Sequence, residues 1–319
     1  MDKQYQPTLT EVQDWVLKLY NTCEQTITKA ERLEQHKYAV MVQRPQDKKF
    51  LVEMLDESSQ IRDRKILAKR IKTLLDQYGV PEFLNKRDAF LFKMYQAFGH
   101  HFDFIAIPII KKRLRMDTSQ VIINEERPQL TKHLATRFKE KIGQNVNLLG
   151  EVVLGNGEAD HRYHHYLEAL ESPDINYISV KISGIYAQTH ALNYEESFPE
   201  LVSRMSALYQ KAIDFPYTDE DGIKRSKFIN LDMEEYKDAH FTLRLFKAVL
   251  NLPQFKNYSA GIVAQAYLPD AYDFQTELLE FAKARVDGGG APIKMRLVKG
   301  CNLEMETVIS SLKGWPNPI

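Results

Sequence analysis

The chain has 319 residues, of which 44% are hydrophobic and 27% are charged, and this composition excludes a largely disordered protein. Lysine plus arginine and aspartate plus glutamate each total 43, so the zero net charge excludes a general electrostatic attraction to nucleic acid or to an anionic membrane. Two distant cysteines, Cys23 and Cys301, match neither a disulfide framework nor a Cys-x-x-Cys metal site, which favours a reducing, cytoplasmic environment.

Residues 1 to about 135 are predicted to form an all-helical arm. Thr10 and Gln13 match a capping box at the start of the first helix, while Gly79 and Pro81 are expected to end a later one. Apolar residues recur at helical spacing in two stripes: Val12, Trp15, Val16, Leu19 and Cys23, then Leu67, Ile71, Leu74, Leu75 and Tyr78.

Three further stretches of the arm bear on partners and location. Basic residues gather at 61–72 and 111–115, but acidic residues lie nearby, so we interpret both as solvated helix faces and expect no nucleic-acid partner. The apolar run 104–110 is interrupted by Pro108 and is far too short to cross a bilayer, and the N-terminus has no signal sequence. We therefore expect neither a secreted nor a transmembrane protein.

From about residue 140 to 319, short strand-like runs alternate with helical segments, a pattern that predicts parallel pairing through crossovers. The runs are residues 145–151, 177–183, 228–234, 261–268 and 293–300. Each has one apolar face, because neighbouring strand residues point to opposite sides. The opposite faces carry Asn147 and Glu151; Tyr177, Ser179, Lys181 and Ser183; Asn230, Asp232 and Glu234; Gly261, Val263, Gln265 and Tyr267; and Lys294, Arg296 and Val298.

The two-faced strands distinguish between α/β architectures. A doubly wound sheet is covered by helices on both faces, so its central strands should be apolar throughout, and these are not. A barrel with helices outside and polar residues inside fits better, although a sheet covered on one side only is the alternative. We predict an α/β fold: a helical arm followed, over residues 140–319, by an incomplete (β/α)8 barrel with about five of its eight strands.

The strands' polar residues are expected to meet in one cavity. Its members come from four different strands: Lys181, Asp232, Gln265 and Arg296. Lys299 would follow in the loop at the mouth of the barrel, where the active sites of such folds assemble. Buried cations need partners, and Asp232 and Glu151 are the natural counter-ions, unless a bound anion takes that role. A purely structural network of ion pairs is the alternative.

Six segments resemble, in order and spacing, those of the proline dehydrogenase domain. They are NVNLLGE, YISVKIS, FINLDMEEYKD, SAGIVAQAYLPD, GGGAPIKMRLVKGCNLEME and LKGWPNP. The resemblance runs from about residue 140 to the end, and more weakly back through YGVPEFL in the arm. It is greatest to the long bifunctional proline utilization A proteins, in which a pyrroline-5-carboxylate dehydrogenase follows on the same chain. A single segment would be weak, but six in order are specific.

This resemblance implies FAD-dependent oxidation of L-proline to pyrroline-5-carboxylate, by hydride transfer to the flavin. It implies that Gln265, Arg296, Lys299 and Gly300 contact FAD together with Asp232, and that Lys181 and Asp232 lie at the substrate end. The implied catalytic residues are Lys181, Asp232 and Arg296. Glu151 would correspond to a carboxylate that pairs with a substrate-binding arginine and closes the site.

Two departures from the family pattern affect these expectations. Asn302 stands where the wider family often has tyrosine, although the long bifunctional branch commonly has asparagine. The family's last three barrel strands, its final helix with the paired arginines that bind the proline carboxylate, and the aldehyde dehydrogenase domain have no counterpart in these residues. We therefore expect half a site, whose activity in this chain alone stays open.

The resemblance also implies a quinone as the electron acceptor, and hence a cytoplasmic protein with peripheral contact at the inner face of the cell membrane. A homo-oligomer stays open. Two other functions compete: a Schiff-base lyase that uses Lys181 as its nucleophile, and a non-catalytic half-barrel scaffold. We expect no metal site, because the cluster of His161, His164 and His165 lacks a matching third ligand pattern.

Overall fold

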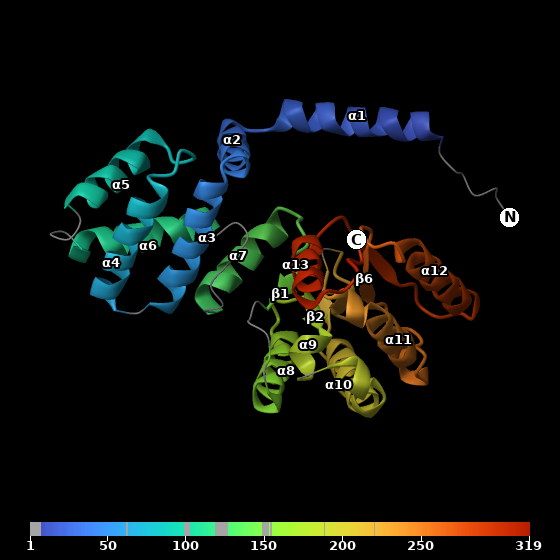
Figure 1. Ribbon diagram of the computed structural model, residues 1–319. Coiled ribbons are helices and arrows are strands. Elements are labelled where there is room, and N and C mark those ends of the chain that lie inside the picture. The colour runs from blue at the N-terminus through green and yellow to red at the C-terminus, as the bar shows by residue number, and fades with distance from the viewer. Residues whose placement is uncertain are drawn as a thin grey trace. The chain divides into compact units, whose positions relative to one another are not determined.

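The computed structural model describes residues 8–61, 63–98, 103–118, 127–148, 153, 155–187, 189–219 and 221–319. The chain divides into two compact units, Met1–Asn124 and Glu125–Ile319 (Figure 1). Among the described helices, none is long and apolar enough to cross a membrane.

The described elements of the first unit are all helices, as predicted. Its helices are α1 (Leu9–Thr26), α2 (Lys29–Gln43), α3 (Pro45–Gln60), α4 (Arg64–Tyr78), α5 (Lys86–Phe98) and α6 (Asp103–Thr118). The capping box lies two residues earlier than expected, because Thr8 is extended and exchanges hydrogen bonds with Glu11. The predicted helix end at Gly79 is confirmed, with φ of 78° at that glycine.

The two apolar stripes of this unit have different surroundings. Leu67, Ile71, Leu74 and Leu75 of α4 are buried in a core that α3, α5 and α6 complete. The stripe of α1 is exposed, and that helix has no buried residue. Helical periodicity therefore identified both stripes but did not determine which of them packs.

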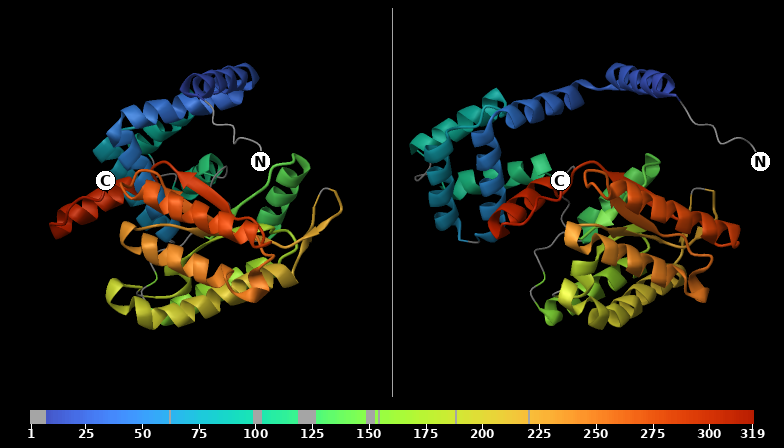
Figure 2. Two further views of the ribbon diagram at one scale, coloured as in Figure 1. Left: turned by 90° about the vertical axis from the view of Figure 1, so that its right-hand side faces the viewer. Right: turned by 45° about the vertical axis from the view of Figure 1, so that its right-hand side comes forward.

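The second unit combines five parallel strands with helices. In chain order its elements are α7 (Arg127–Lys139), β1 (Val146–Asn147), α8 (Asn156–Glu171), β2 (Tyr177–Lys181), α9 (Ile182–Ile185), η2 (Ala191–Asn193), α10 (Tyr194–Asp214), β3 (Tyr217–Thr218), β4 (Lys224–Arg225), β5 (Phe228–Asp232), η3 (Tyr236–Asp238), α11 (Ala239–Leu250), η4 (Pro253–Phe255), β6 (Gly261–Gln265), α12 (Ala271–Asp287), β7 (Lys294–Val298) and α13 (Leu303–Lys313). The short antiparallel β3–β4 hairpin projects from this unit (Figure 2).

The strands follow one another across the sheet in the order β1-β2-β5-β6-β7, and all pairs are parallel. Sequential order without a switch point is the arrangement of a (β/α) barrel and not of a doubly wound sheet, so the predicted fold class is confirmed. The apolar strand residues pack against α8, α10 and α11 in one core, whose strand members include Ile178, Val180, Ile229, Leu231 and Ile262.

The strands are shorter than the sequence predicted. The second run was expected to continue to Ser183, but β2 ends at Lys181 because residues 182–185 form the single turn α9. The third and fourth runs end at Asp232 and Gln265. The alternation of polar and apolar residues therefore continues beyond the end of each of these strands. Backbone pairing, and not the side-chain pattern, determines where a strand ends.

One buried cation of this unit lies outside the predicted cavity. Lys227 is 2% exposed, and its ammonium group donates to the carbonyl oxygen of Ser172. Burial lowers the pKa of Lys227 from 10.5 to about 8, although the charge of Asp174 opposes the shift. The charged amine is therefore less stable in the folded protein than in the unfolded chain.

Lys227→Met is expected to stabilise the protein most below pH 8. The unfolded chain binds the proton of Lys227 up to about pH 10.5, whereas the folded protein releases it near pH 8. Wild-type stability should therefore rise relative to the variant between those values, by at most about 3 kcal/mol. Urea unfolding at pH 7.5, 8.5 and 9.5 measures the difference. Lys224→Met, at an exposed lysine of β4, is the control, and a difference independent of pH would contradict the prediction.

Candidate active site

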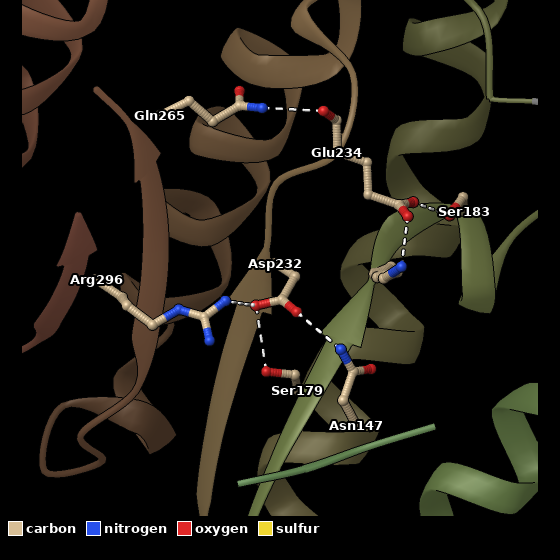
Figure 3. A network of polar contacts seen from close by, with 8 residues as sticks. Asn147, Ser179, Ser183, Asp232, Glu234, Gln265 and Arg296 are labelled. Atoms are coloured by element: carbon tan, nitrogen blue, oxygen red, sulfur yellow. Dashed lines mark hydrogen bonds and ion pairs between the residues drawn. The ribbon is translucent and has the colours of Figure 1, made fainter. Parts of the chain in front are cut away.

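The sheet register places the predicted residues beside one another. Lys181 pairs with Asp232 across β2 and β5, and Val263 pairs with Arg296 across β6 and β7. Gln265 lies two residues beyond Val263 on the same face of β6. In Figure 3, side chains from β1, β2 and β7 converge on Asp232, while Gln265 and Glu234 lie further towards the C-terminal ends of their strands.

Asp232 is the centre of this face. Its Oδ1 accepts hydrogen bonds from Arg296 Nη2 at 2.8 Å, from Asn230 Nδ2 at 2.7 Å and from Ser179 Oγ at 3.2 Å. Its Oδ2 accepts from Asn147 Nδ2 at 3.3 Å. Donors from four strands thus fix the carboxylate, and only Arg296 among them carries a charge.

Burial raises the pKa of the Asp232 carboxyl above its ordinary value, and it is the largest influence on that group. The charge of Arg296 and the hydrogen bonds from Ser179 and Asn230 act in the opposite direction. Because the Asp232 side chain is 8% exposed, the desolvation of a lone carboxylate would be costly there, and Arg296 offsets part of that cost. Removing Arg296 would therefore leave the Asp232 carboxylate buried without this charged partner.

Close packing under Asp232 depends on a glycine. A Cβ atom added to Gly261 of β6 would lie 2.6 Å from Asn230 Oδ1 and 2.9 Å from the Phe228 ring. The absence of a side chain at Gly261 therefore leaves the space in which the Asn230 amide reaches Asp232.

Arg296 and Lys299 offer cationic donors at the C-terminal end of the sheet. The Arg296 side chain is 43% exposed, and its bond to Asp232 is its one hydrogen bond within the described ranges. Lys299 and Gly300 lie in the bend after β7, as the end of the strand at Val298 requires, and both are exposed. Guanidinium and ammonium groups in such positions can bind an anionic or oxygen-rich ligand.

Lys181 has a partner that sequence reasoning missed. Its Nζ lies 2.6 Å from Glu234 Oε1, and Ser183 Oγ donates to Glu234 Oε2 at 2.5 Å. Glu234 belongs to the polar face that alternation assigned to the third run, so its position two residues after Asp232 was the available signal. Asn147, Ser179 and Asn230 share that polar alternation and were likewise not recognised as partners of Asp232.

Gln265 is buried with one polar atom unsatisfied. The residue is 4% exposed, and its Nε2 donates to the Glu234 carbonyl at 2.9 Å and to Tyr267 Oη at 2.6 Å. Its Oε1 has no hydrogen-bond partner in the part of the chain that the structure describes. An unsatisfied buried acceptor is unfavourable by itself, and a ligand N–H group would satisfy it.

The structure describes the histidine cluster but not the expected gate. Glu151, the expected gate, lies outside the described residues. His161 and His165 stack edge to face with ring centroids 4.4 Å apart, and no group of three or more potential metal ligands occurs within the described ranges.

A cavity of about 530 Å³ lies at the opposite, N-terminal end of the strands. Its wall includes the first residues of four strands, Val146, Tyr177, Phe228 and Lys294. The Lys294 ammonium lies over both aromatic rings, 5.1 Å from the Tyr177 centroid and 5.6 Å from that of Phe228. None of the predicted site residues lines this cavity.

Comparisons with known proteins agree with the fold. A family model described as proline dehydrogenase matches residues 130–319. Proline utilization A from Corynebacterium freiburgense is similar, with 42% identity, a TM-score of 0.58 and coverage of 65% of this chain and 21% of that chain. The protein of the same name from Bdellovibrio bacteriovorus, inactivated by N-propargylglycine, gives 25% identity, a TM-score of 0.67 and coverage of 91% and 28%.

A Bradyrhizobium japonicum proline utilization A mutant, 17% identical with a TM-score of 0.57, supports the fold alone. The chain spans less than a third of the length of each of these three solved structures. No curated protein matches it.

Proposed function

Because the chain belongs to the proline dehydrogenase family, we propose that the polar face of its second unit is part of a site that oxidises L-proline to pyrroline-5-carboxylate with FAD as cofactor. The observation that carries the proposal is the pair of buried Asp232 with partly exposed Arg296, near a buried glutamine with an unsatisfied oxygen. Positioned cations and an unfilled acceptor at this end of the sheet can bind the phosphates and a ring N–H group of a flavin cofactor.

The residues present fit FAD. Arg296 retains guanidinium donors beyond the one given to Asp232, and Lys299 adds a second exposed cation in the bend that also contains Gly300. Gln265 Oε1 would accept a ligand N–H group. When bound, FAD would supply the acceptor for the hydride that proline loses.

In this proposal the protein's residues position the reactants and stabilise the charge that develops on them. Asp232 holds the Arg296 guanidinium in place, and a cation so held would stabilise negative charge that develops nearby. Lys181 would lie near the substrate carboxylate, and Glu234 would orient it until the substrate competes for the ammonium group. Enclosure of the reactants at this end of the barrel would contribute through proximity and orientation.

The same contacts weigh against a Schiff-base lyase. Its nucleophile must be free to attack a carbonyl carbon, whereas Lys181 Nζ is held by the carboxylate of Glu234, 2.6 Å away. Borohydride trapping with a carbonyl substrate tests this alternative, because only a Schiff-base enzyme would be labelled covalently.

The first experiment is to mix the purified chain with excess FAD, remove free flavin by gel filtration and add L-proline without oxygen. The proposal predicts a yellow protein fraction that bleaches on addition of proline. Retained flavin that does not bleach, even after addition of the remaining part of a longer relative's barrel, would contradict proline oxidation. A colourless protein would contradict FAD binding by this chain and favour the non-catalytic scaffold.

The partners of the proposed reaction follow from family membership. We propose a quinone as the acceptor that reoxidises the flavin, a cytoplasmic location with peripheral membrane contact, and an aldehyde dehydrogenase domain in the full protein. Whether the protein forms a homo-oligomer is tested by sedimentation of the same flavin-loaded sample.

A further inference from the structure

A second network of polar contacts connects the loops at the C-terminal ends of β5, β6 and β7. Glu306 Oε1 accepts the Tyr236 backbone N–H at 2.7 Å and the Asn302 side-chain amide at 3.1 Å. Tyr236 follows β5, whereas Asn302 follows β7 and directly precedes α13. One carboxylate oxygen therefore joins two loops that are 66 residues apart in sequence.

The network continues to the glutamine of the candidate site. The Asn302 backbone N–H donates to Tyr267 Oη at 3.2 Å, and Gln265 Nε2 donates to the same hydroxyl oxygen at 2.6 Å. Tyr267 thus accepts from the loop after β7 and from the last residue of β6. A continuous series of hydrogen bonds leads from Glu306 to Gln265, and the bend with Lys299 and Gly300 lies just before Asn302.

Glu306 is placed where a surface residue would not be. It is 7% exposed, although three of its neighbours in α13, Glu304, Met305 and Thr307, are exposed. Burial of a carboxylate is unfavourable unless it is hydrogen-bonded, and here both donors come from outside the body of the helix. Its position in the first turn of α13 adds a favourable interaction with the helix dipole.

We infer that Glu306 is a positioning residue that holds the loops after β5 and β7 together and thereby sets the affinity of the site for FAD. This inference depends on the proposed FAD site. Without the carboxylate, the Tyr236 N–H and the Asn302 amide lose their common acceptor. The loop after β7 then keeps its bond to Tyr267 but loses this link to the loop after β5. Glutamine at this position retains an oxygen that can accept from both donors.

The test compares Glu306→Ala, Glu306→Gln and Glu304→Ala by FAD titration and by hydrogen exchange at the Tyr236 amide. Glu304→Ala removes the same charge from an exposed position of the same turn and is the matched control. Glu306→Ala should weaken FAD binding by about tenfold and speed Tyr236 exchange by a similar factor. Glu306→Gln and Glu304→Ala should stay within about twofold of wild type in both.

The outcomes separate this inference from the proposed function. Wild-type affinity in Glu306→Ala, or a loss in Glu306→Gln as large as in the alanine variant, would overturn the positioning role. If the wild-type chain binds no FAD, the FAD proposal fails. Tyr236 exchange then decides whether Glu306 holds the loops, and unchanged exchange in Glu306→Ala overturns that as well.

Faster hydrogen exchange at Leu231 inside β5 would reveal that Glu306→Ala has lost its fold. A second variant, Asn302→Ala, tests the inference in that case. Asn302→Ala keeps the carboxylate and its bond to Tyr236. It should leave Tyr236 protected and still weaken FAD binding at least threefold, because the loop after β7 loses its side-chain bond to Glu306, although the backbone N–H of residue 302 can still donate to Tyr267. Unchanged FAD affinity in that variant would overturn the inference.

Discussion

Replacing Asp232 by alanine is expected to reduce the rate at which L-proline bleaches bound flavin by at least about 100-fold, the effect typical of losing one aligned electrostatic group in an active site. The carboxylate holds the Arg296 guanidinium at 2.8 Å and accepts hydrogen bonds from Asn147 on β1, Ser179 on β2 and Asn230 on its own strand. In its absence Arg296 loses its counter-ion and its fixed orientation. Anaerobic stopped-flow absorbance of the flavin measures the rate.

Two companion variants make this result interpretable. Asp232→Asn keeps the size of the side chain but removes its charge and presents an N–H group to one of the present donors, so it should lose nearly as much rate. Glu280→Ala removes a carboxylate from an exposed position of α12 and should behave as wild type. Bleaching of Asp232→Ala at the wild-type rate would exclude Asp232 from the reaction.

Replacing Arg285 by alanine is expected to lower the free energy of unfolding by about 3 kcal/mol, because buried carbonyl groups would lose a charged donor. Arg285, in the last turn of α12, donates to five backbone carbonyls around the turns that precede β6 and β7: Leu250, Phe255, Lys256, Tyr258 and Ala291. Burial lowers the pKa of Arg285 below its ordinary value, although an arginine so strongly basic stays charged.

Arg285→Lys tests whether the planar guanidinium group of Arg285 is required for this stability. A lysine ammonium cannot reach carbonyls in several directions, so Arg285→Lys should recover less than half of the lost stability. Lys283→Ala is the control, since Lys283 is exposed and, within the described residues, pairs with Asp287 alone at the surface. Urea unfolding followed by circular dichroism measures all three variants, and an Arg285→Ala protein as stable as the Lys283→Ala protein would contradict the structural role.

The candidate site was predictable in part. Alternation along the strands placed Lys181, Asp232, Gln265 and Arg296 on one face. The register of the sheet pairs Lys181 with Asp232, and Arg296 with Val263 of β6. Their roles towards FAD and proline stay predictions. Alternation predicts the face on which a residue lies but not its partner. Asp232 was therefore expected to be a counter-ion for any cation of this face, whereas in the structure Lys181 pairs with Glu234.

Residues outside the alternating pattern were not predictable. Arg285 and Lys283 look alike in the sequence, because both are cations in the last turns of one helix, yet only Arg285 reaches the carbonyls that five separate backbone positions present. Glu306 is likewise one of two acidic residues in its helix. What distinguishes each of them is the backbone of distant segments.

The sequence by itself determined the class of fold, the faces of the strands and the order of helices and strands, because these depend on interactions between residues a few positions apart. The tertiary structure alone decided which charged groups pair, where each strand ends, and which helical residues are buried. Those outcomes depend on register and on contacts between segments far apart in the chain, since a buried charge is stable only where another segment brings its partner within hydrogen-bonding distance.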